Sequence, residues 1–271
     1  MFSIKQDSTR QFIKWSVYTL LIINFVFYFA EDWSRAMHTL DAESTFYDWT
    51  SEFATTIDES AWFLLLFLLE LETYVINKEK WRDWLSTLMH WIRAVCLIMI
   101  AHTLVAVVDT VIDYEKVNIV ENVTELCELS NGDVSYVYNL EYTEVNEITC
   151  NNLSAADQFF WLGEDPLVSD FEGLQLAQNL AWTDVIEVIV WLLILLAIEA
   201  TVRLQSGGIT NGKWITRLGT IKIVSYTILL GLGAYWGYLS HWLYTWDTIL
   251  WIGGFTAIEA NLSMVKSNQS K

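Results

Sequence analysis

Several ionisable side chains stand inside apolar stretches of this sequence. They are the carboxylates of Glu70, Glu72, Asp109, Glu187, Glu199 and Glu259, together with the imidazole of His102. Ionisable groups inside a bilayer are costly, and where they occur they commonly mark ion paths or proton relays. We therefore take these seven residues as candidate members of an ion pathway.

Three of the glutamates lie in similar short sequence segments. Ala197-Ile198-Glu199-Ala200 matches Ala257-Ile258-Glu259-Ala260, and Glu70-Leu71-Glu72 is a weaker version of the same pattern. If the three segments occupy equivalent positions on their helices, Glu72, Glu199 and Glu259 form a carboxylate ring, as in cation-selective constrictions. The alternative is that each glutamate reaches the interface or pairs locally, as Arg203 allows for Glu199 four residues earlier.

His102 and Asp109 stand seven residues apart and therefore share one face of a helix. Histidine and aspartate in that relation can pass a proton. The alternative is a neutral imidazole that bonds across to Asn24, to Thr227 or to a backbone carbonyl.

The apolar stretches that carry these residues are long enough to cross a membrane as helices. The chain has 271 residues, 54% of them hydrophobic, with 15 tryptophans and a single proline. About 20 residues of helix span the hydrocarbon core of a bilayer, and unpaired backbone groups are not tolerated there. We predict an all-α integral membrane protein with six transmembrane helices, at residues 12–30, 61–76, 91–111, 185–202, 221–239 and 243–262. The repeated sequence segments suggest three tandem helical hairpins.

The charged residues predict the orientation of these helices. Thirteen of the 15 lysines and arginines fall on one side of the predicted spans, and the exceptions are Arg35 and Lys116. The opposite loops, 31–60 and 113–178, hold 22 acidic residues. Basic residues are retained in the cytoplasm, so both termini are expected there. A plasma membrane or bacterial inner membrane location follows.

The long acidic loop carries its own structural signals. Cys127 and Cys150 both lie in it, and the outer side of a membrane allows a disulfide between them. The alternating segment 133–148 predicts a β-hairpin closed by that bond. We expect helices 1–3 and the outer loop 31–60 within residues 1–112, an outer domain at 113–180, and helices 4–6 at 181–271.

The fifth predicted helix contains a small-xxx-small pattern at Gly231, Gly233 and Gly237, which is typical of close helix packing. No phosphate-binding loop, nucleophile elbow, CxxC pair or metal-binding spacing is present in the sequence. We therefore expect neither an enzyme, a bound cofactor nor a nucleic-acid partner.

Two functions fit these features. In the first, a channel-like or transporter-like protein moves a small cation or a proton by means of its intramembrane carboxylates. In the second, the chain is a non-transporting accessory or scaffold subunit, and its polar residues join helices or subunits. The expected partners are the lipid bilayer, a cation or proton, and a second copy of the chain or another membrane subunit.

Overall fold

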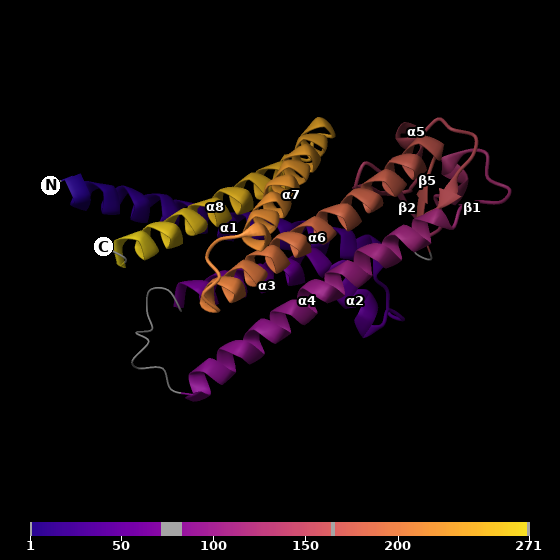
Figure 1. Cartoon of the computed structure of the whole chain (residues 1–271). Coiled ribbons are helices and arrows are strands. Elements are labelled where there is room, and N and C mark those ends of the chain that lie inside the picture. The colour runs from indigo at the N-terminus through magenta and orange to yellow at the C-terminus, as the bar shows by residue number, and fades with distance from the viewer. Residues whose placement is uncertain (1, 72–82, 164–165, 270–271) are drawn as a thin grey trace. The chain divides into compact units, whose positions relative to one another are not determined.

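The computed structural model describes residues 2–71, 83–163 and 166–269, and 73% of the chain is helical (Figure 1). The fold divides into two compact units, residues 1–27 with 187–271 (unit 1) and residues 28–186 (unit 2). Helices α1 (Phe2–Thr39) and α6 (Phe171–Ser206) contribute to both units.

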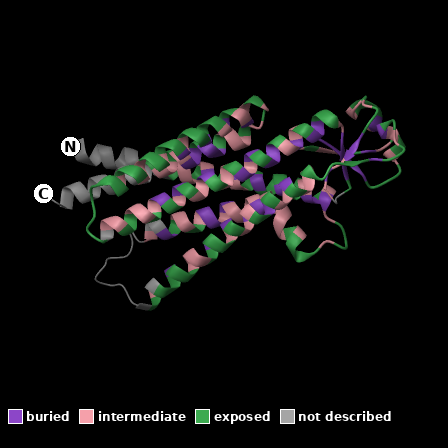
Figure 2. Cartoon of the chain, turned by 45° about the vertical axis from the view of Figure 1, so that its right-hand side comes forward, coloured by how far each residue is buried: buried purple, intermediate pink, exposed green. Residues whose placement is uncertain are grey.

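Three helices among the described residues are long and apolar enough to cross a membrane, by length and composition. They are α4 (Asp83–Glu115), α6 and α7 (Lys213–Tyr238). Exposed apolar side chains occur along these helices, as at Ile98 and Leu196, and Figure 2 shows exposed positions running along the long helices. Such surfaces are compatible with a membrane protein.

The other three predicted spans also fall on helices, namely α1, α3 (Ala54–Glu70) and α8 (Trp242–Gln269), but the structure does not support six spans by the same measure. Helix α3 is described over 17 residues, and the predicted span 61–76 continues into residues 72–76, which lie outside the described residues. For α1 and α8, the side chains at one end of the helix lie outside the described residues.

In unit 1, α7 and α8 form a helical hairpin and lie side by side (Figure 1). The turn between them contains Ser240, whose φ of 71° lies in the left-handed region. Val190 and Ile194 of α6 pack with Leu229 of α7 in a buried cluster that Ile252 of α8 adjoins. This apolar core brings α6, α7 and α8 together.

In unit 2, most of the predicted outer loop 31–60 is helical, which corrects the expectation of a loop. Helix α1 continues to Thr39, and the short helix α2 (Phe46–Glu52) precedes α3. A capping box starts α2, because the Thr45 hydroxyl accepts from the Asp48 backbone N–H and the Asp48 carboxylate accepts from that of Thr45. Helix α3 packs against α4, and Thr103 of α4 donates to the Ala54 carbonyl at 3.3 Å.

The segment after α4, which is the predicted outer segment, folds into a five-stranded sheet, so the expectation of an all-α protein is incomplete. The strand order is β1-β4-β5-β2-β3, and the β2–β5 pair is parallel while the other pairs are antiparallel. The strands are β1 (Asn118–Ile119), β2 (Ser135–Tyr138), β3 (Glu141–Glu144), β4 (Phe160–Trp161) and β5 (Leu167–Ser169). Strands β2 and β3 are the hairpin that the alternating segment predicts.

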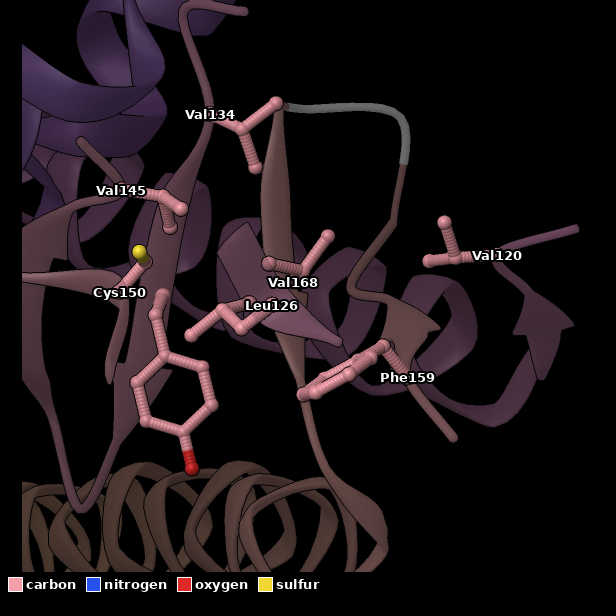
Figure 3. Close-up of a cluster of buried hydrophobic side chains, with 8 residues drawn as sticks. Val120, Leu126, Val134, Val145, Cys150, Phe159 and Val168 are labelled. Atoms are coloured by element: carbon pink, nitrogen blue, oxygen red, sulfur yellow. The ribbon is translucent and has the colours of Figure 1, made fainter. Parts of the chain in front are cut away.

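A small apolar core holds this sheet to the loops that cover it. Val120, Leu126, Phe159 and Val168 are among its buried members, which converge from different elements in Figure 3. The loops carry the 3-10 helix η3 (Leu126–Leu129) and the short helix α5 (Cys150–Leu153). The predicted disulfide between Cys127 and Cys150 is confirmed, and it joins η3 to α5.

Candidate functional site

The seven candidate pathway residues fall into different parts of the structure. Glu187 and Glu199 belong to unit 1, and His102 and Asp109 belong to unit 2. Glu72 lies outside the described residues, as do the side chains of Glu70 and Glu259. The described residues therefore do not test the predicted ring of glutamates.

Glu199 takes part in a local ion pair. Its carboxylate accepts a hydrogen bond from Arg203 Nε at 2.7 Å, and both side chains are more than half exposed. This is the arrangement that the four-residue spacing allows. Exposed pairs of this kind bring little stability.

Glu187 lies among hydrogen-bond donors from three helices. Its Oε2 accepts from the indole N–H of Trp236 on α7 at 3.0 Å, and its Oε1 lies 3.5 Å from the hydroxyl of Thr248 on α8. Trp191, one turn further along α6, also hydrogen-bonds this carboxylate. Trp236 is fully buried and Thr248 is 1% exposed, so the site is closed to solvent on the side of α7 and α8.

The hydroxyl of Thr248 gives this site two possible proton arrangements. It donates to the Tyr244 carbonyl at 3.0 Å, and it lies within reach of Glu187 Oε1. When Glu187 is ionised, the hydroxyl can turn its hydrogen toward the carboxylate. When Glu187 is protonated, the carboxyl can donate to Thr248 Oγ1, whose own hydrogen stays on the Tyr244 carbonyl. One arrangement of the heavy atoms is therefore compatible with both protonation states of Glu187.

A second polar pair in unit 1 joins α1 to α8. The Asn24 amide donates from Nδ2 to Asp247 Oδ1 at 2.5 Å, and the two residues are 1% and 8% exposed. Asp247 and Thr248 are consecutive on α8, so one turn of this helix faces both polar groups. Sequence reasoning places Asn24 and Asp247 in apolar stretches but does not pair them.

The glycines of the predicted packing motif divide into two kinds. A Cβ at Gly233 would lie 3.5 Å from Thr248, and one at Gly237 would lie 3.1 Å from Thr245 Oγ1. Thr245 also donates to the Gly233 carbonyl at 2.7 Å. Gly231 meets nothing within 4 Å among the described residues. Gly233 and Gly237 thus let α8 approach α7 where the polar groups lie.

In unit 2, His102 and Asp109 share a partner from α2 rather than contacting each other. The Tyr47 hydroxyl donates to Asp109 Oδ2, and the Tyr47 ring lies 5.8 Å from the His102 ring in an edge-on arrangement. Burial and the Asp109 hydrogen bond raise the pKa of the Tyr47 phenol. The alternative of a neutral imidazole bonded to Asn24, Thr227 or a backbone carbonyl stays a prediction.

Within the described ranges, no group of three or more His, Cys, Asp or Glu side chains is placed to hold a metal ion. Neither protein-family models, nor curated proteins, nor solved structures match this chain.

Proposed function

We propose that the protein moves protons or a small cation across the bilayer, with Glu187 as the group that carries the ion. The observation that supports this is the set of partners around Glu187: Trp191, Trp236 and Thr248 are all neutral. A structural ion pair would instead hold the carboxylate with an arginine or a lysine. Neutral donors stabilise the charged form without fixing it, so protonation remains reversible.

Flux measurements in liposomes test this function. Purified protein is reconstituted with a pH-sensitive dye inside, and proton and cation flux are driven by an imposed potential. We expect wild-type flux above that of empty liposomes, and Glu187→Gln to reduce it to the empty-liposome level. Glutamine keeps the size and the accepting oxygen of the side chain but cannot take up a proton.

Two further variants make the result specific to Glu187. Glu172→Gln, an exposed position on the same helix, should leave flux unchanged. Glu199→Gln tests the predicted glutamate ring, because loss of flux there would transfer the carrier role to that ring. Folded wild-type protein without flux for protons or for several cations would refute the proposed function.

A second candidate function, that of an accessory or scaffold subunit, is supported by the way the polar groups join helices. Asn24 with Asp247 bridges α1 and α8, and Glu187 with Trp236 bridges α6 and α7. Interhelical hydrogen bonds of this kind stabilise membrane bundles without any transport role. In this case Glu187→Gln lowers stability, the wild type shows no flux, and the protein co-purifies with another membrane subunit or a second copy of itself.

We also propose that the chain crosses the membrane six times with both termini in the cytoplasm. Helices α4, α6 and α7 are long and apolar enough by themselves. Packing against such neighbours supports the shorter α3 and the less apolar α8, because α3 packs on α4 and α8 packs on α7. The distribution of basic residues supports the orientation.

A further inference from the structure

Four aromatic rings of unit 2, called the aromatic patch below, form an exposed surface on α1, α2 and the start of α3. The Phe53 ring, between α2 and α3, lies 5.9 Å from the ring of Phe29 and 6.2 Å from that of Trp33, both on α1. It also stacks with the Trp49 ring of α2 at 6.3 Å. Phe29, Trp33 and Trp49 are each between 45% and 51% exposed. Exposed apolar patches mark contact with a membrane or with another protein.

Polar contacts hold α2 in place beside the aromatic patch. Glu52 pairs with Arg35 of α1 at 2.8 Å, and the Asp48 carboxylate accepts from a backbone N–H at the start of α2. The Tyr47 hydroxyl donates to Asp109 of α4. The carboxylates of α2 are thus bound to protein groups, and the Trp49 ring is left exposed. The aromatic patch is therefore a fixed surface rather than part of a loose loop.

The position of the aromatic patch along α1 matches the end of the first proposed span. That span, residues 12–30, ends one residue after Phe29, and α1 continues to Thr39. Trp33 follows Ala30 by three residues, or about 5 Å at 1.5 Å per residue. The headgroup layer on each side of the hydrocarbon is about 5–8 Å thick. With residues 12–30 in the hydrocarbon, Trp33 therefore lies at the level of the headgroups.

The exposed side chains of α1 also change in type at this boundary. Val26 is 59% exposed, and helical spacing places it on the same face as Phe29 and Trp33. Aliphatic side chains favour the hydrocarbon, whereas tryptophan gathers at the headgroup level. One face of α1 thus runs from an aliphatic surface to the aromatic patch without a polar interruption. This continuity favours lipid over a protein partner as the occupant of the patch.

We propose that the aromatic patch is an interfacial anchor, which inserts among lipid headgroups and fixes the depth of α1, α2 and α3 in the bilayer. A tryptophan ring is largely apolar, and its N–H can bond to headgroup or water oxygens. Residues 31–60 contain eight acidic residues and one basic residue, Arg35, so attraction to anionic lipids does not drive the insertion. Burial of aromatic surface drives it instead. The level of Trp33 rests on the proposed six-span topology, and the anchor does not depend on ion movement.

Spin-label accessibility measures where the aromatic patch lies. Phe46 is 84% exposed and stands one turn before Trp49 on α2, so a nitroxide on Phe46→Cys reports the level of the patch and leaves its four rings in place. The full-length protein is reconstituted in phosphatidylcholine vesicles. Collision rates of the label with oxygen, which concentrates in lipid, and with a water-soluble nickel chelate are measured. We expect an oxygen-to-nickel ratio several times that of a label on Asp157→Cys, an exposed position after α5.

Variants assign the depth to the rings. Adding Trp33→Ser and Trp49→Ser should lower the ratio at Phe46→Cys toward that at Asp157→Cys. Adding Ile148→Ser instead, which removes an exposed apolar side chain of unit 2 outside the aromatic patch, should leave the ratio at Phe46→Cys unchanged. If the double tryptophan variant fails to fold, the ratio at Phe46→Cys with both tryptophans present still decides.

Two results would overturn the anchor. A ratio at Phe46→Cys equal to that at Asp157→Cys places the aromatic patch in water. Low collision rates with both reagents show that protein covers it, either a second copy of the chain or another subunit. The flux assay separates these results from failure of the proposed function. Flux without lipid exposure of Phe46→Cys keeps transport and removes the anchor, whereas lipid exposure without flux keeps the anchor and removes transport.

Discussion

At the scale of single residues, Asp170 shows how one carboxylate can organise a junction. It precedes α6, and its Oδ1 accepts from the Gly173 backbone N–H at 2.9 Å. Its Oδ2 accepts from Tyr136 Oη at 2.8 Å and from Ser154 Oγ at 2.6 Å. Asp170 therefore caps the helix and ties the start of α6 to the sheet and to the loop after α5.

These contacts make the stability of the outer segment sensitive to acid. Burial raises the pKa of Asp170, but the hydrogen bonds from Ser154, Gly173 and Tyr136 outweigh it, and the pKa lies below its usual value. A lowered folded-state pKa gives stability that is complete above the unfolded value of about 4 and is lost as the pH falls below it. Asp170→Asn should therefore destabilise by about 1 kcal/mol near pH 7 and by less at pH 3.

Thermal unfolding between pH 3 and pH 7 measures this difference. Asp133→Asn, an exposed position in the same segment, is the matched control and should follow the wild type at every pH. A difference between the wild type and Asp170→Asn that stays constant down to pH 3 would contradict the prediction.

The residue scale also shows where sequence reasoning reaches its limit. Glu187 is a candidate on sequence grounds because it is an ionisable group in an apolar stretch. Its partners Trp236 and Thr248 are not predictable in the same way, because helical periodicity relates residues on one helix and not faces of different helices. The same holds for Asn24 and Asp247, which are 223 positions apart. Of these contacts between helices, the sequence predicts only the close packing of α7 on α8 at Gly233, through the small-xxx-small pattern of α7.

At the scale of elements, Arg35 joins α1 to α2. Its Nε lies 2.8 Å from Glu52 Oε2, and its Nη2 lies 3.3 Å from Asp32 Oδ1. Asp32 is 3% exposed and also accepts from the backbone and hydroxyl of Thr56 on α3. The one arginine of the predicted outer loop 31–60 is thus fixed by structure, which explains why it stands on the acidic side.

Removing this arginine should loosen the junction of the three helices. Arg35→Gln leaves the buried Asp32 without its cation, and we expect a loss of about 2 kcal/mol, below the full value for a buried pair because Arg35 is partly exposed. Lys116, whose pair with Asp113 at 2.8 Å is well exposed, provides the control. Lys116→Gln should change the free energy of unfolding by less than about 0.5 kcal/mol, and equal losses in both variants would refute the argument.

The disulfide is the second element-scale prediction. It spans 23 positions, and closing a loop of that size stabilises a fold by about 3 kcal/mol through the unfolded chain. A Cys127→Ser/Cys150→Ser variant should therefore become sensitive to proteases between residues 116 and 170. Limited proteolysis with mass spectrometry locates the cuts. If first cuts instead fall within the long helices, the sheet does not depend on the disulfide.

The sequence predicts some helices and strands more clearly than others. The hairpin β2–β3 follows from the alternation of residues 133–148, and the long helices follow from their apolar runs. Strands β1 and β4 are two residues each, too short for any periodic signal, and they join the sheet by pairing β1 with β4 and β4 with β5. Helix α2 has a local signal in the Thr45–Asp48 capping box, yet the acidic composition around it favours a loop.

At the scale of the whole molecule, the proposed topology rests on the distribution of charge together with that of apolar residues. The 22 acids of the two predicted outer loops and the 13 basic residues of the opposite side leave one orientation favoured for every helix. Length and composition by themselves support only α4, α6 and α7 among the described helices. A six-span and a three-span topology place Glu43, between α1 and α2, on opposite sides of the membrane. With six spans it lies outside, whereas with only three it lies inside.

Cysteine labelling distinguishes these topologies. Cys96 is buried and the other two cysteines form a disulfide, so the native cysteines should not react with a maleimide. Labelling of a single introduced cysteine therefore reports the side of the membrane on which that cysteine lies. With six spans, a membrane-impermeant maleimide should label Glu43→Cys and Asp157→Cys in intact cells, and Asn211→Cys only after permeabilisation. All three positions are exposed. With three spans, Glu43→Cys would be protected and a tag on the C-terminus would be accessible. Protection of Glu43→Cys would therefore remove the six-helix topology while leaving the outer sheet in place, because Asp157 lies outside in both cases.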